Sequence, residues 1–331
     1  MEIDAFRAHS PVVLITWPDF EASAPECLAR LRSAGCRPRL APKVGRRSSA
    51  ELASMLSDVD AVIASTDPFD HAVLTSAPSL RVIARVGVGV DSIDVGTAAA
   101  QGIAVSVSGD LNASTTADHA VALMLAALRR IPEHDRAVRS GAWPRTGSDA
   151  PWELAGAAVG LVGFGRIGRL VARRLRGFDV TLRACDPDAA SDAEVGMVDL
   201  PSLLRESDVV SLHLPLNEGT RGLIGASELE TMRADAVLVN TARGELVDQD
   251  ALAEALQAGR LRAAALDVFD EEPPVASRIL EFDNVIVTPH TGGISTRSVA
   301  QMLRQATTDV LDVLAGRAPA GLINGPLAVS R

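Results

Sequence analysis

Short runs of branched apolar residues alternate along this chain with longer stretches in which apolar residues recur three and four positions apart. A parallel sheet produces this alternation, because each strand must be followed by a crossover, usually a helix, that returns the chain to the same edge. The apolar runs predict strands at Val12–Thr16, Ala61–Ala64, Val82–Arg85, Val159–Val162, Val180–Cys185, Val209–Leu212, Val237–Asn240, Ala263–Asp267 and Val285–Thr288. The periodic stretches predict helices at Pro25–Ala34, Ser48–Ser57, Thr116–Arg130, Arg166–Arg176, Leu200–Arg205, Ala226–Thr231 and Asp248–Ala258. The sequence therefore predicts a doubly wound α/β architecture.

This pattern is interrupted twice, and a chain of 331 residues is long for one core. Gly, Ser, Trp and Pro replace the pattern around Ser106–Asn112 and Arg139–Pro151, and a last amphipathic stretch, Ser295–Leu314, has no strand after it. We therefore expect two parallel-sheet domains, with the end of the chain returning to the first one. The expected domains are residues 1–108 completed by 295–331, for the substrate, and residues 109–294, for the nucleotide.

The chain is acidic, with 42 Asp and Glu against 32 Lys and Arg and a net charge of −10. A field of that sign repels nucleic acid and anionic membranes, so we expect neither as a partner. The longest apolar stretch without glycine, Ala120–Leu128, is half of what a bilayer span needs. Glu2 and Asp4 stand where a signal peptide would be basic, so we expect a cytoplasmic protein.

The three cysteines, Cys27, Cys36 and Cys185, form no CxxC pair. Their odd number and their spacing predict reduced packing residues, as a cytoplasmic protein would have, and neither a disulfide framework nor a zinc site. No HExxH motif is present, and His9, His71, His119 and His134 lack partners at ligand spacing. We expect no metal.

The segment GFGRIG, residues 163–168, directly follows a predicted strand and opens a predicted helix. Gly163 would make the tight turn, Gly165 would let the backbone approach a pyrophosphate, and Gly168 would let the helix pack on the strand. The helix N-terminus supplies free N–H groups that suit a phosphate. The motif alone is a weak indication of a nucleotide site, because an ordinary glycine-rich turn between a strand and a helix can have the same sequence.

Asp186 makes the signal stronger. It ends the next predicted strand, eighteen residues after Gly168. A carboxylate at this place can accept both ribose hydroxyls of an adenosine, and it would repel a 2′-phosphate. The sequence therefore predicts a dinucleotide site that takes NAD rather than NADP.

Three further polar segments follow predicted strands: NTARGE at 240–245, DVFDEEPP at 267–274 and TPHTGG at 288–293. Open α/β sheets place their ligands at the carboxyl ends of the strands, so Arg243, Glu272 and His290 are expected to meet in one crevice.

Reduction of a 2-oxo acid needs these residue types. A guanidinium can hold the substrate carboxylate and polarise the neighbouring C=O group. An imidazole can give a proton to the developing alkoxide, and a carboxylate beside it favours the charged form and orients the ring. Taken singly, Arg243 is typical of a helix cap or surface base, Glu272 of a solvated acidic loop and His290 of a strand end; the combination after a dinucleotide motif indicates catalysis.

These motifs, together with HLPL at residues 213–216, resemble the D-isomer-specific 2-hydroxyacid dehydrogenases from about Ala61 to the C-terminus. The resemblance implies reversible hydride transfer between NADH and a small 2-oxo acid. It also implies that Arg243 binds and polarises the substrate, that His290 is the acid/base and contacts the substrate, and that Glu272 is its partner. Asp267 would contact the nicotinamide amide.

The resemblance extends to the residues that would hold the cofactor and to the substrate domain. The cofactor-binding residues predicted in this way are Gly163, Gly165, Arg166, Ile167, Gly168, Asp186, His213, Thr116, Thr241, Ala242, Asp267, Gly292 and Gly293. In the loop after Arg85, the backbone N–H groups of Val88 and Gly89 would bind the substrate carboxylate; a strand-ending turn is the alternative. Asp118 stands where the family has Glu, so the role of that carboxylate is in doubt. Trp143 lies in a stretch that forms a dimer arm in relatives, which implies a homodimer, although a buried anchor is the alternative.

The substrate is less well defined. Phosphoglycerate dehydrogenases often carry an arginine where this chain has Ala64 to Phe69, and here Ala64 and Asp67 supply no positive charge, although Arg85 is available. The sequence ends soon after Asn324, so we expect no appended regulatory domain. These features favour a monoanionic 2-oxo acid such as glyoxylate or hydroxypyruvate, with 3-phosphoglycerate as the alternative.

Two other activities occur in relatives of this fold. An NAD(H)-sensing corepressor would bind the cofactor without turnover, and the intact Arg243, Glu272 and His290 favour an enzyme instead. Phosphite or formate oxidation is the other option, but formate enzymes of this fold pair the histidine with Gln where this chain has Glu272.

Overall fold

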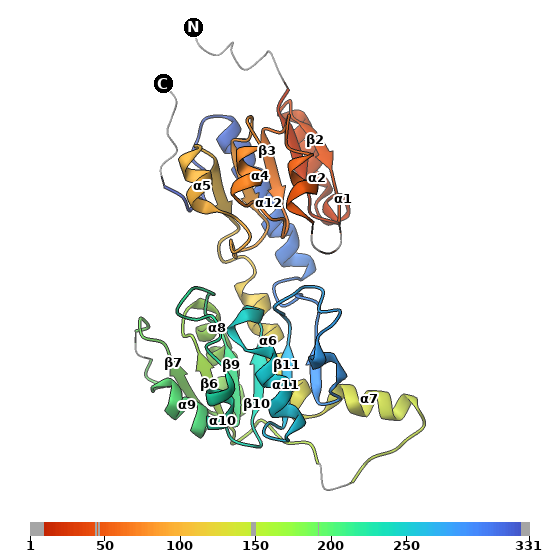
Figure 1. Ribbon diagram of the computed structural model, residues 1–331, viewed down its shortest axis with the longest axis vertical. Helices are drawn as coiled ribbons and strands as arrows, with labels where there is room; N and C mark the ends of the chain where they lie inside the picture. Colours follow the sequence, from red (N-terminus) through yellow and green to blue (C-terminus); the bar gives the residue numbers. More distant parts are fainter. Residues whose placement is uncertain (1–9, 44, 46, 147–149, 191, 326–331) are drawn as a thin grey trace. The chain divides into compact units, whose positions relative to one another are not determined.

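The computed structural model describes residues 10–43, 45, 47–146, 150–190 and 192–325. The chain divides into two compact units, Met1–Asn112 with Ile294–Arg331, and Ala113–Gly293 (Figure 1). The predicted divisions lay after residues 108 and 294. They differ from the observed ones because helix α6 (Ala113–Leu128) opens the second unit and leaves residues 109–112 with the first. Residues 1–9 lie outside the described residues, and with them Glu2, Asp4 and His9 of the sequence analysis. Residues 147–149, part of the predicted boundary Arg139–Pro151, lie outside them as well.

The first unit contains a five-stranded parallel sheet in the order β2-β1-β3-β4-β5. Its strands are β1 (Val12–Ile15), β2 (Arg37–Leu40), β3 (Ala61–Ala64), β4 (Val82–Arg85) and β5 (Ala104–Val107). Its helices are α1 (Phe20–Ser23), α2 (Pro25–Ser33), α3 (Ser49–Ala53), α4 (His71–Thr75), α5 (Val95–Ala100) and α12 (Thr296–Leu314).

Both faces of this sheet are covered, as the apolar character of its strands requires. Alternate residues of β1 point to opposite faces: Val13 and Ile15 join a core with α1, α2 and α12, whereas Val12 and Leu14 join a core with α3, α4 and α5. Helix α12 comes from the end of the chain and buries one face in the first of these cores. The first unit is therefore discontinuous in sequence.

The second unit contains a seven-stranded parallel sheet in the order β12-β11-β10-β9-β6-β7-β8. Its strands are β6 (Ala158–Val162), β7 (Thr181–Cys185), β8 (Gly196–Met197), β9 (Val209–Leu212), β10 (Val237–Asn240), β11 (Ala263–Leu266) and β12 (Val285–Val287). Its helices are α6, α7 (Ile131–Arg139), α8 (Arg166–Leu175), α9 (Leu200–Glu206), α10 (Ala226–Thr231) and α11 (Gln249–Gln257). Short 3-10 turns cover Arg176–Phe178, Gly244–Leu246 and Arg278–Glu281.

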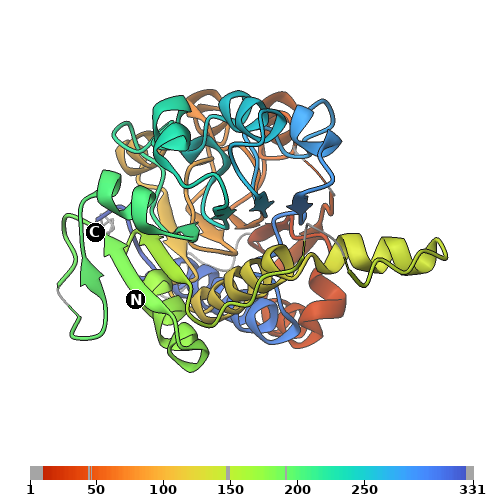
Figure 2. The same cartoon turned by 90° about the horizontal axis from the view of Figure 1, so that it is seen from below.

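Helices cover both faces of this second sheet as well. Within this unit, α6 and α8 lie on one face and α9, α10 and α11 on the other (Figure 2). The strand order reverses at β6, whose neighbours are β9 and β7. Such a reversal opens a crevice at the carboxyl ends of the strands, where ligands bind in folds of this kind. The doubly wound α/β prediction is confirmed.

Some elements were not predicted, for identifiable reasons. Strand β2 reads RPRL, because an edge strand is exposed and need not be apolar. No strand was predicted at β5, whose last two residues fall within the predicted boundary Ser106–Asn112. Helix α7 buries no residue, so no core-facing stripe marks it. In the described part of the chain, no helix is both long and apolar enough to cross a bilayer.

Candidate active site

The glycine loop after β6 has the geometry that its spacing predicts. Gly163 has φ +93, and a Cβ there would lie 2.5 Å from the backbone oxygen of His213. A Cβ on Gly168 would lie 2.3 Å from the carbonyl oxygen of Gly163, so helix α8 packs against the loop because residue 168 has no side chain. Gly165 faces open space, with no heavy atom within 4 Å of its Cβ position. The turn and the close packing are therefore made by the outer glycines, and the middle one is accessible.

Helix α8 begins directly after this loop, with Gly165 as its N-cap. No side chain caps the helix, and a helix N-terminus of this kind suits an anion. Arg166 is exposed and Ile167 is half-buried at the same helix end. These residues fit a pyrophosphate.

Asp186 lies directly beyond β7 and is held by the loop that it faces. Its Oδ2 accepts the N–H of Phe164 at 2.7 Å, and its Oδ1 accepts the N–H of Asp188 at 3.0 Å. The carboxylate is half-buried and adjoins the glycine loop. Its position is the one predicted for a contact to the adenosine ribose.

His213 follows β9, and its N–H donates to the carbonyl of Val162 at 2.7 Å. Its two ring nitrogens are buried, and neither has a hydrogen-bond partner in the described part of the chain. Burial lowers the pKa of His213 from 6.5 to about 4. The ring is therefore neutral at physiological pH, which agrees with a supporting role and not with that of a base.

Arg243 is presented by a loop that its neighbours hold firmly. The side chain of Asn240, at the end of β10, accepts the N–H of Ala242 at 3.0 Å and donates to the carbonyl of Arg243 at 2.7 Å. A Cβ on Gly244 would lie 2.0 Å from the backbone carbon of Phe269, so the loops after β10 and β11 touch because residue 244 is glycine. Thr241 is buried, and Ala242 and Arg243 are half-buried.

His290 and Glu272 form the pair that the sequence predicts. The Nδ1 atom of His290 lies 2.8 Å from Oε2 and 3.0 Å from Oε1 of Glu272. Oε1 also accepts the N–H of Phe269 at 3.2 Å, which fixes the carboxylate against the loop after β11. The side chains of His290 and Glu272 are 43% and 34% exposed, so a ligand can reach the ring.

Asp267 is 1% exposed at the end of β11. Its carboxylate accepts the hydroxyl of Thr288 at 2.5 Å and the N–H groups of Thr291 and Gly292 at 2.9 and 2.7 Å. Burial by itself raises the pKa of Asp267, but hydrogen bonds from His119, Thr288, Gly292 and Thr291 outweigh it and hold this pKa below its ordinary value. Asp267 is thus an ionised carboxylate that protein donors already surround. Gly293, next in the same loop, is half-buried.

His119, on α6, lacks partners at metal-ligand spacing in the sequence and was given no role there, but the structure places it beside two polar groups. Its Nε2 lies 3.0 Å from Oγ1 of Thr288 and 3.4 Å from Oδ1 of Asp267. Thr116 is buried one helical turn before it. Asp118 pairs with Arg174 of α8 at 2.5 Å and therefore joins two helices of the domain. No signal along the sequence links residue 119 to residue 288, because only folding brings α6 to the end of β12.

The predicted substrate loop lies in the first unit, after β4. Gly87 has φ +137, and Arg85 donates to the carbonyls of Val86 at 2.8 Å and Gly89 at 3.2 Å. Val88 is 49% exposed. Among the described residues, the backbone N–H groups of Val88 and Gly89 donate to no protein acceptor.

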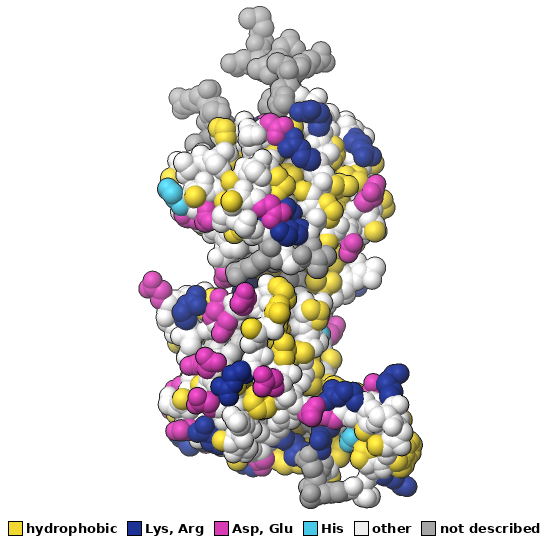
Figure 3. Space-filling model, turned by 45° about the vertical axis from the view of Figure 1, so that its right-hand side comes forward, with side chains coloured by type: hydrophobic (Ala, Val, Ile, Leu, Met, Phe, Trp, Pro, Cys, Tyr) yellow, Lys and Arg dark blue, Asp and Glu magenta, His cyan; other side chains and the backbone are white. Residues whose placement is uncertain are grey.

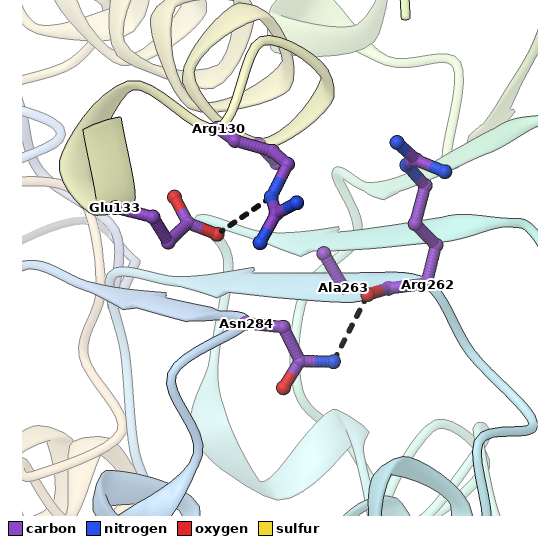
Figure 4. A pocket seen from close by; sticks show the side chains of 6 residues that line it. Arg130, Glu133, Arg262, Ala263 and Asn284 are labelled. Atoms are coloured by element: carbon purple, nitrogen blue, oxygen red, sulfur yellow. Dashed lines mark hydrogen bonds and ion pairs between the residues drawn. The ribbon is translucent and has the colours of Figure 1, made fainter. Parts of the chain in front are cut away.

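A separate polar pocket of the second unit lies at the amino ends of strands β11 and β12, away from the carboxyl ends that carry the candidate site. It is lined by Ala127, Arg130, Glu133, Arg262, Ala263 and Asn284 (Figure 4). Arg130 lies 3.6 Å from Glu133, and Asn284 donates to the carbonyl of Arg262 at 2.9 Å. These contacts are internal to the pocket, which does not include the residues predicted to react. Among the described residues, no group of three or more His, Cys, Asp or Glu could hold a metal ion.

Within the second unit, the end of β6 carries a glycine loop, and the ends of β10, β11 and β12, which lie beyond β9 in the same sheet, carry a guanidinium and a carboxylate-imidazole pair. This arrangement defines the class of Rossmann-type oxidoreductases.

The comparisons with known proteins identify the family. The family model for the D-isomer specific 2-hydroxyacid dehydrogenase NAD binding domain matches residues 121–292. A glyoxylate reductase of Korarchaeum cryptofilum is 40% identical over 278 residues, which are 81% of this chain and 84% of that protein. A D-3-phosphoglycerate dehydrogenase of Archaeoglobus fulgidus is 38% identical over 270 residues, 80% of this chain. The chain spans about half the length of that second relative, 51%.

Solved structures agree. A Thermus thermophilus protein of 35% identity has a TM-score of 0.87 and is matched over 94% of this chain and 99% of its own. The NADPH-dependent glyoxylate/hydroxypyruvate reductase of Sinorhizobium meliloti, in complex with NADP and malonate, has a TM-score of 0.82 at 29% identity, over 95% of this chain and 97% of its own. The chain belongs to the D-isomer-specific 2-hydroxyacid dehydrogenase family.

Proposed function

We propose that this protein reduces a small, singly charged 2-oxo acid of the glyoxylate or hydroxypyruvate type with NADH, and that His290 is the acid/base. The observation that supports this proposal best is the hydrogen-bonded pair of His290 and Glu272 at the carboxyl edge of the nucleotide-binding sheet. Neither residue is buried, so the pair is accessible to a substrate.

The geometry favours one nitrogen of His290 for proton transfer. Its Nδ1 faces the carboxylate of Glu272 at 2.8 Å, so Nε2 is the atom that can deliver a proton to the substrate oxygen. The carboxylate fixes the orientation of the ring for this transfer. Arg243, two strands away in the same sheet, would hold the substrate carboxylate and polarise the carbonyl, since its charge is permanent.

The nucleotide-binding residues support a dinucleotide. The open space at Gly165 and the uncapped N-terminus of α8 fit a pyrophosphate, and Asp186 fits a ribose with free hydroxyls. When bound, the nicotinamide supplies the hydride at its C4. We propose NAD because the Asp186 carboxylate would repel a 2′-phosphate, although the similar Sinorhizobium meliloti enzyme is described as NADPH-dependent.

The first unit favours a substrate without phosphate. The guanidinium of Arg85 is bound to the carbonyls of its own loop, Val86 and Gly89. Arg47 and Asp67 form a buried pair at 3.0 Å, with side chains 5% and 6% exposed. Because the charge of Arg47 is already neutralised by Asp67, the pair offers no net charge to a substrate phosphate. The exposed loop of Val88 and Gly89 would bind a carboxylate through backbone N–H groups alone.

The experiment that tests the proposal is oxidation of NADH and of NADPH by the purified protein against a panel of 2-oxo acids. We expect turnover of glyoxylate or hydroxypyruvate with NADH, and weaker turnover of 3-phosphohydroxypyruvate. Preference for the phosphorylated acid would support a phosphoglycerate dehydrogenase. Tight NADH binding without turnover of any acid would support the NAD(H)-sensing corepressor alternative. Oxidation of formate or phosphite would support the third alternative.

Arg243→Ala is expected to lower kcat/KM for the 2-oxo acid by about 10²–10³, because it removes the group that binds and polarises the carbonyl. Arg243→Lys is the matched control, since it keeps the charge but loses the two-pronged hydrogen-bond geometry, and should recover part of the loss. Steady-state kinetics at saturating NADH measure both. Unchanged kinetics in the alanine variant would contradict the assignment.

Helix α7 and the segment after it favour a homodimer. The helix buries no residue, and Ile131, Val138 and Trp143 are 54%, 50% and 76% exposed. Hydrophobic side chains are visible on the projecting part of the second unit in Figure 3. We propose that a second copy of this chain covers this surface, since apolar groups of this size gain from removal from water. Light scattering should give the mass of a dimer for the wild-type protein and a lower mass for Trp143→Ser.

The free thiols favour a reducing compartment. Cys27 and Cys36 are buried and Cys185 is half-buried, all without a disulfide. We propose a cytoplasmic location, which cell fractionation tests.

A further inference from the structure

One carboxylate organises the loop that carries His290. The carbonyl oxygen of Asp267 accepts the N–H of His290 at 2.8 Å, and its side chain accepts the N–H groups of Thr291 and Gly292. Three consecutive residues of this loop are therefore bound to a single residue at the end of β11. A Cβ on Gly292 would lie 2.8 Å from Oδ2 of Asp267, so the close approach requires glycine.

The loop needs this support. His290 has φ +55, in the left-handed region that residues with a side chain rarely adopt. Without its hydrogen bonds, the backbone would relax toward a more populated conformation, and the ring would move away from Glu272. The position of His290 therefore depends on the backbone carbonyls of Asp267 and Thr288, which accept its N–H, and on the Asp267 carboxylate, which holds the next two residues of the loop.

His119 completes this network from helix α6. The single hydroxyl proton of Thr288 is donated to Asp267 at 2.5 Å, so Oγ1 of Thr288 must accept from its other neighbour. That neighbour is Nε2 of His119, at 3.0 Å. Nε2 of His119 therefore carries a proton, and hydrogen bonds run from α6 through Thr288 to the carboxylate, whose Oδ1 also lies 3.4 Å from Nε2.

We infer that His119 is a positioning residue for the reaction: through Thr288, and by its own approach to Oδ1 at 3.4 Å, it fixes the Asp267 carboxylate, which in turn holds the loop of His290 beside Glu272. The effect on turnover rests on the proposed function, but the network itself does not. Asp267 acquires a role in shaping the acid/base loop in addition to its predicted contact with the nicotinamide.

Amide hydrogen exchange tests the network without any assay of activity. The protein is compared as wild type, His119→Phe, which removes the donor, and His119→Gln, whose amide nitrogen can replace Nε2. We expect the N–H groups of residues 290–292 to exchange about tenfold faster in the phenylalanine variant and within about twofold of wild type in the glutamine variant. Unchanged exchange in the phenylalanine variant, or equal acceleration in both, would overturn the inference.

Kinetics test the consequence for the reaction. We expect kcat to fall about tenfold in His119→Phe, with the KM of the 2-oxo acid and the Kd of NADH within about twofold. Thr288→Val should have a similar effect, and the double variant should be no worse than either single one because both act through the same carboxylate. Additive losses, or a loss of NADH binding alone, would overturn the positioning role. If the wild-type protein reduces no 2-oxo acid, the proposed function fails and hydrogen exchange still decides the network.

Discussion

Two histidines follow strands of the same sheet, yet their surroundings are opposite. His290, after β12, has a side chain 43% exposed and a carboxylate 2.8 Å from its Nδ1. His213, after β9, has buried ring nitrogens without a hydrogen-bond partner in the described chain. Burial lowers the pKa of His213 to about 4, so this ring stays neutral at physiological pH, whereas His290 is the residue proposed to exchange protons with a substrate. Position at a strand end is therefore not sufficient for acid/base work, because access and a partner are also needed.

The largest effect that tests this comparison is on turnover. His290→Asn is expected to lower kcat by about 10²–10⁴ while the Kd of NADH is retained, because the proton donor is lost and the nucleotide loop is not touched. Stopped-flow kinetics and NADH fluorescence measure the two quantities. His71→Asn, at an exposed histidine of the first unit, is the matched control and should keep the wild-type rate. Full turnover by the His290 variant would remove the assignment.

The buried histidine should affect stability and its pH dependence. In the unfolded chain, His213 is protonated as pH falls below the ordinary histidine pKa of 6.5. In the folded protein, His213 is not protonated until pH falls to about 4. The free energy of unfolding should therefore decrease by up to about 3 kcal/mol from this residue as pH falls from 6.5 to 4, and be unaffected above 6.5.

The measurement is urea unfolding of the wild-type protein and of His213→Leu at several pH values. The leucine variant should lose less stability than wild type between pH 6.5 and 4, because it has no ring to protonate. Two curves that run parallel throughout this range would show that the folded protein accommodates the charged ring.

The smallest effect is expected from a change at Glu272, the carboxylate partner of the exposed His290. Glu272→Gln keeps the size of the side chain but removes the carboxylate that faces Nδ1 of His290. We expect kcat, measured at saturating NADH, to fall about tenfold because the ring loses the partner that orients it. A kcat equal to that of wild type would mean that His290 keeps its orientation without the carboxylate.

The motifs that predicted the site share one property: each is local to a strand end. The GFGRIG loop, Arg243, Glu272 and His290 could be found because a parallel sheet brings the carboxyl ends of its strands to one edge. No pattern along the chain indicated that the Asn240 side chain holds the loop of Arg243, or that His119 lies beside Thr288. Those contacts depend on loop conformation and on which helix packs over which strand.

The same distinction applies to the elements of the fold. Strands β1, β3, β4, β9 and β10 were predicted closely because they are buried on both faces and read as apolar runs. Strand β2 and helix α7 were missed because they are exposed, and exposed elements carry no core-facing pattern.

By itself, the amino-acid sequence determined the architecture and predicted the nucleotide loop and the three side chains proposed to react, since hydrophobic periodicity and glycine spacing act over a few neighbouring residues. The tertiary structure alone decided which histidine is exposed and which is kept neutral, because desolvation depends on atoms contributed by several distant segments. It also decided that Asp267 receives donors from Thr288, Thr291 and Gly292, and that His119 reaches this network from α6.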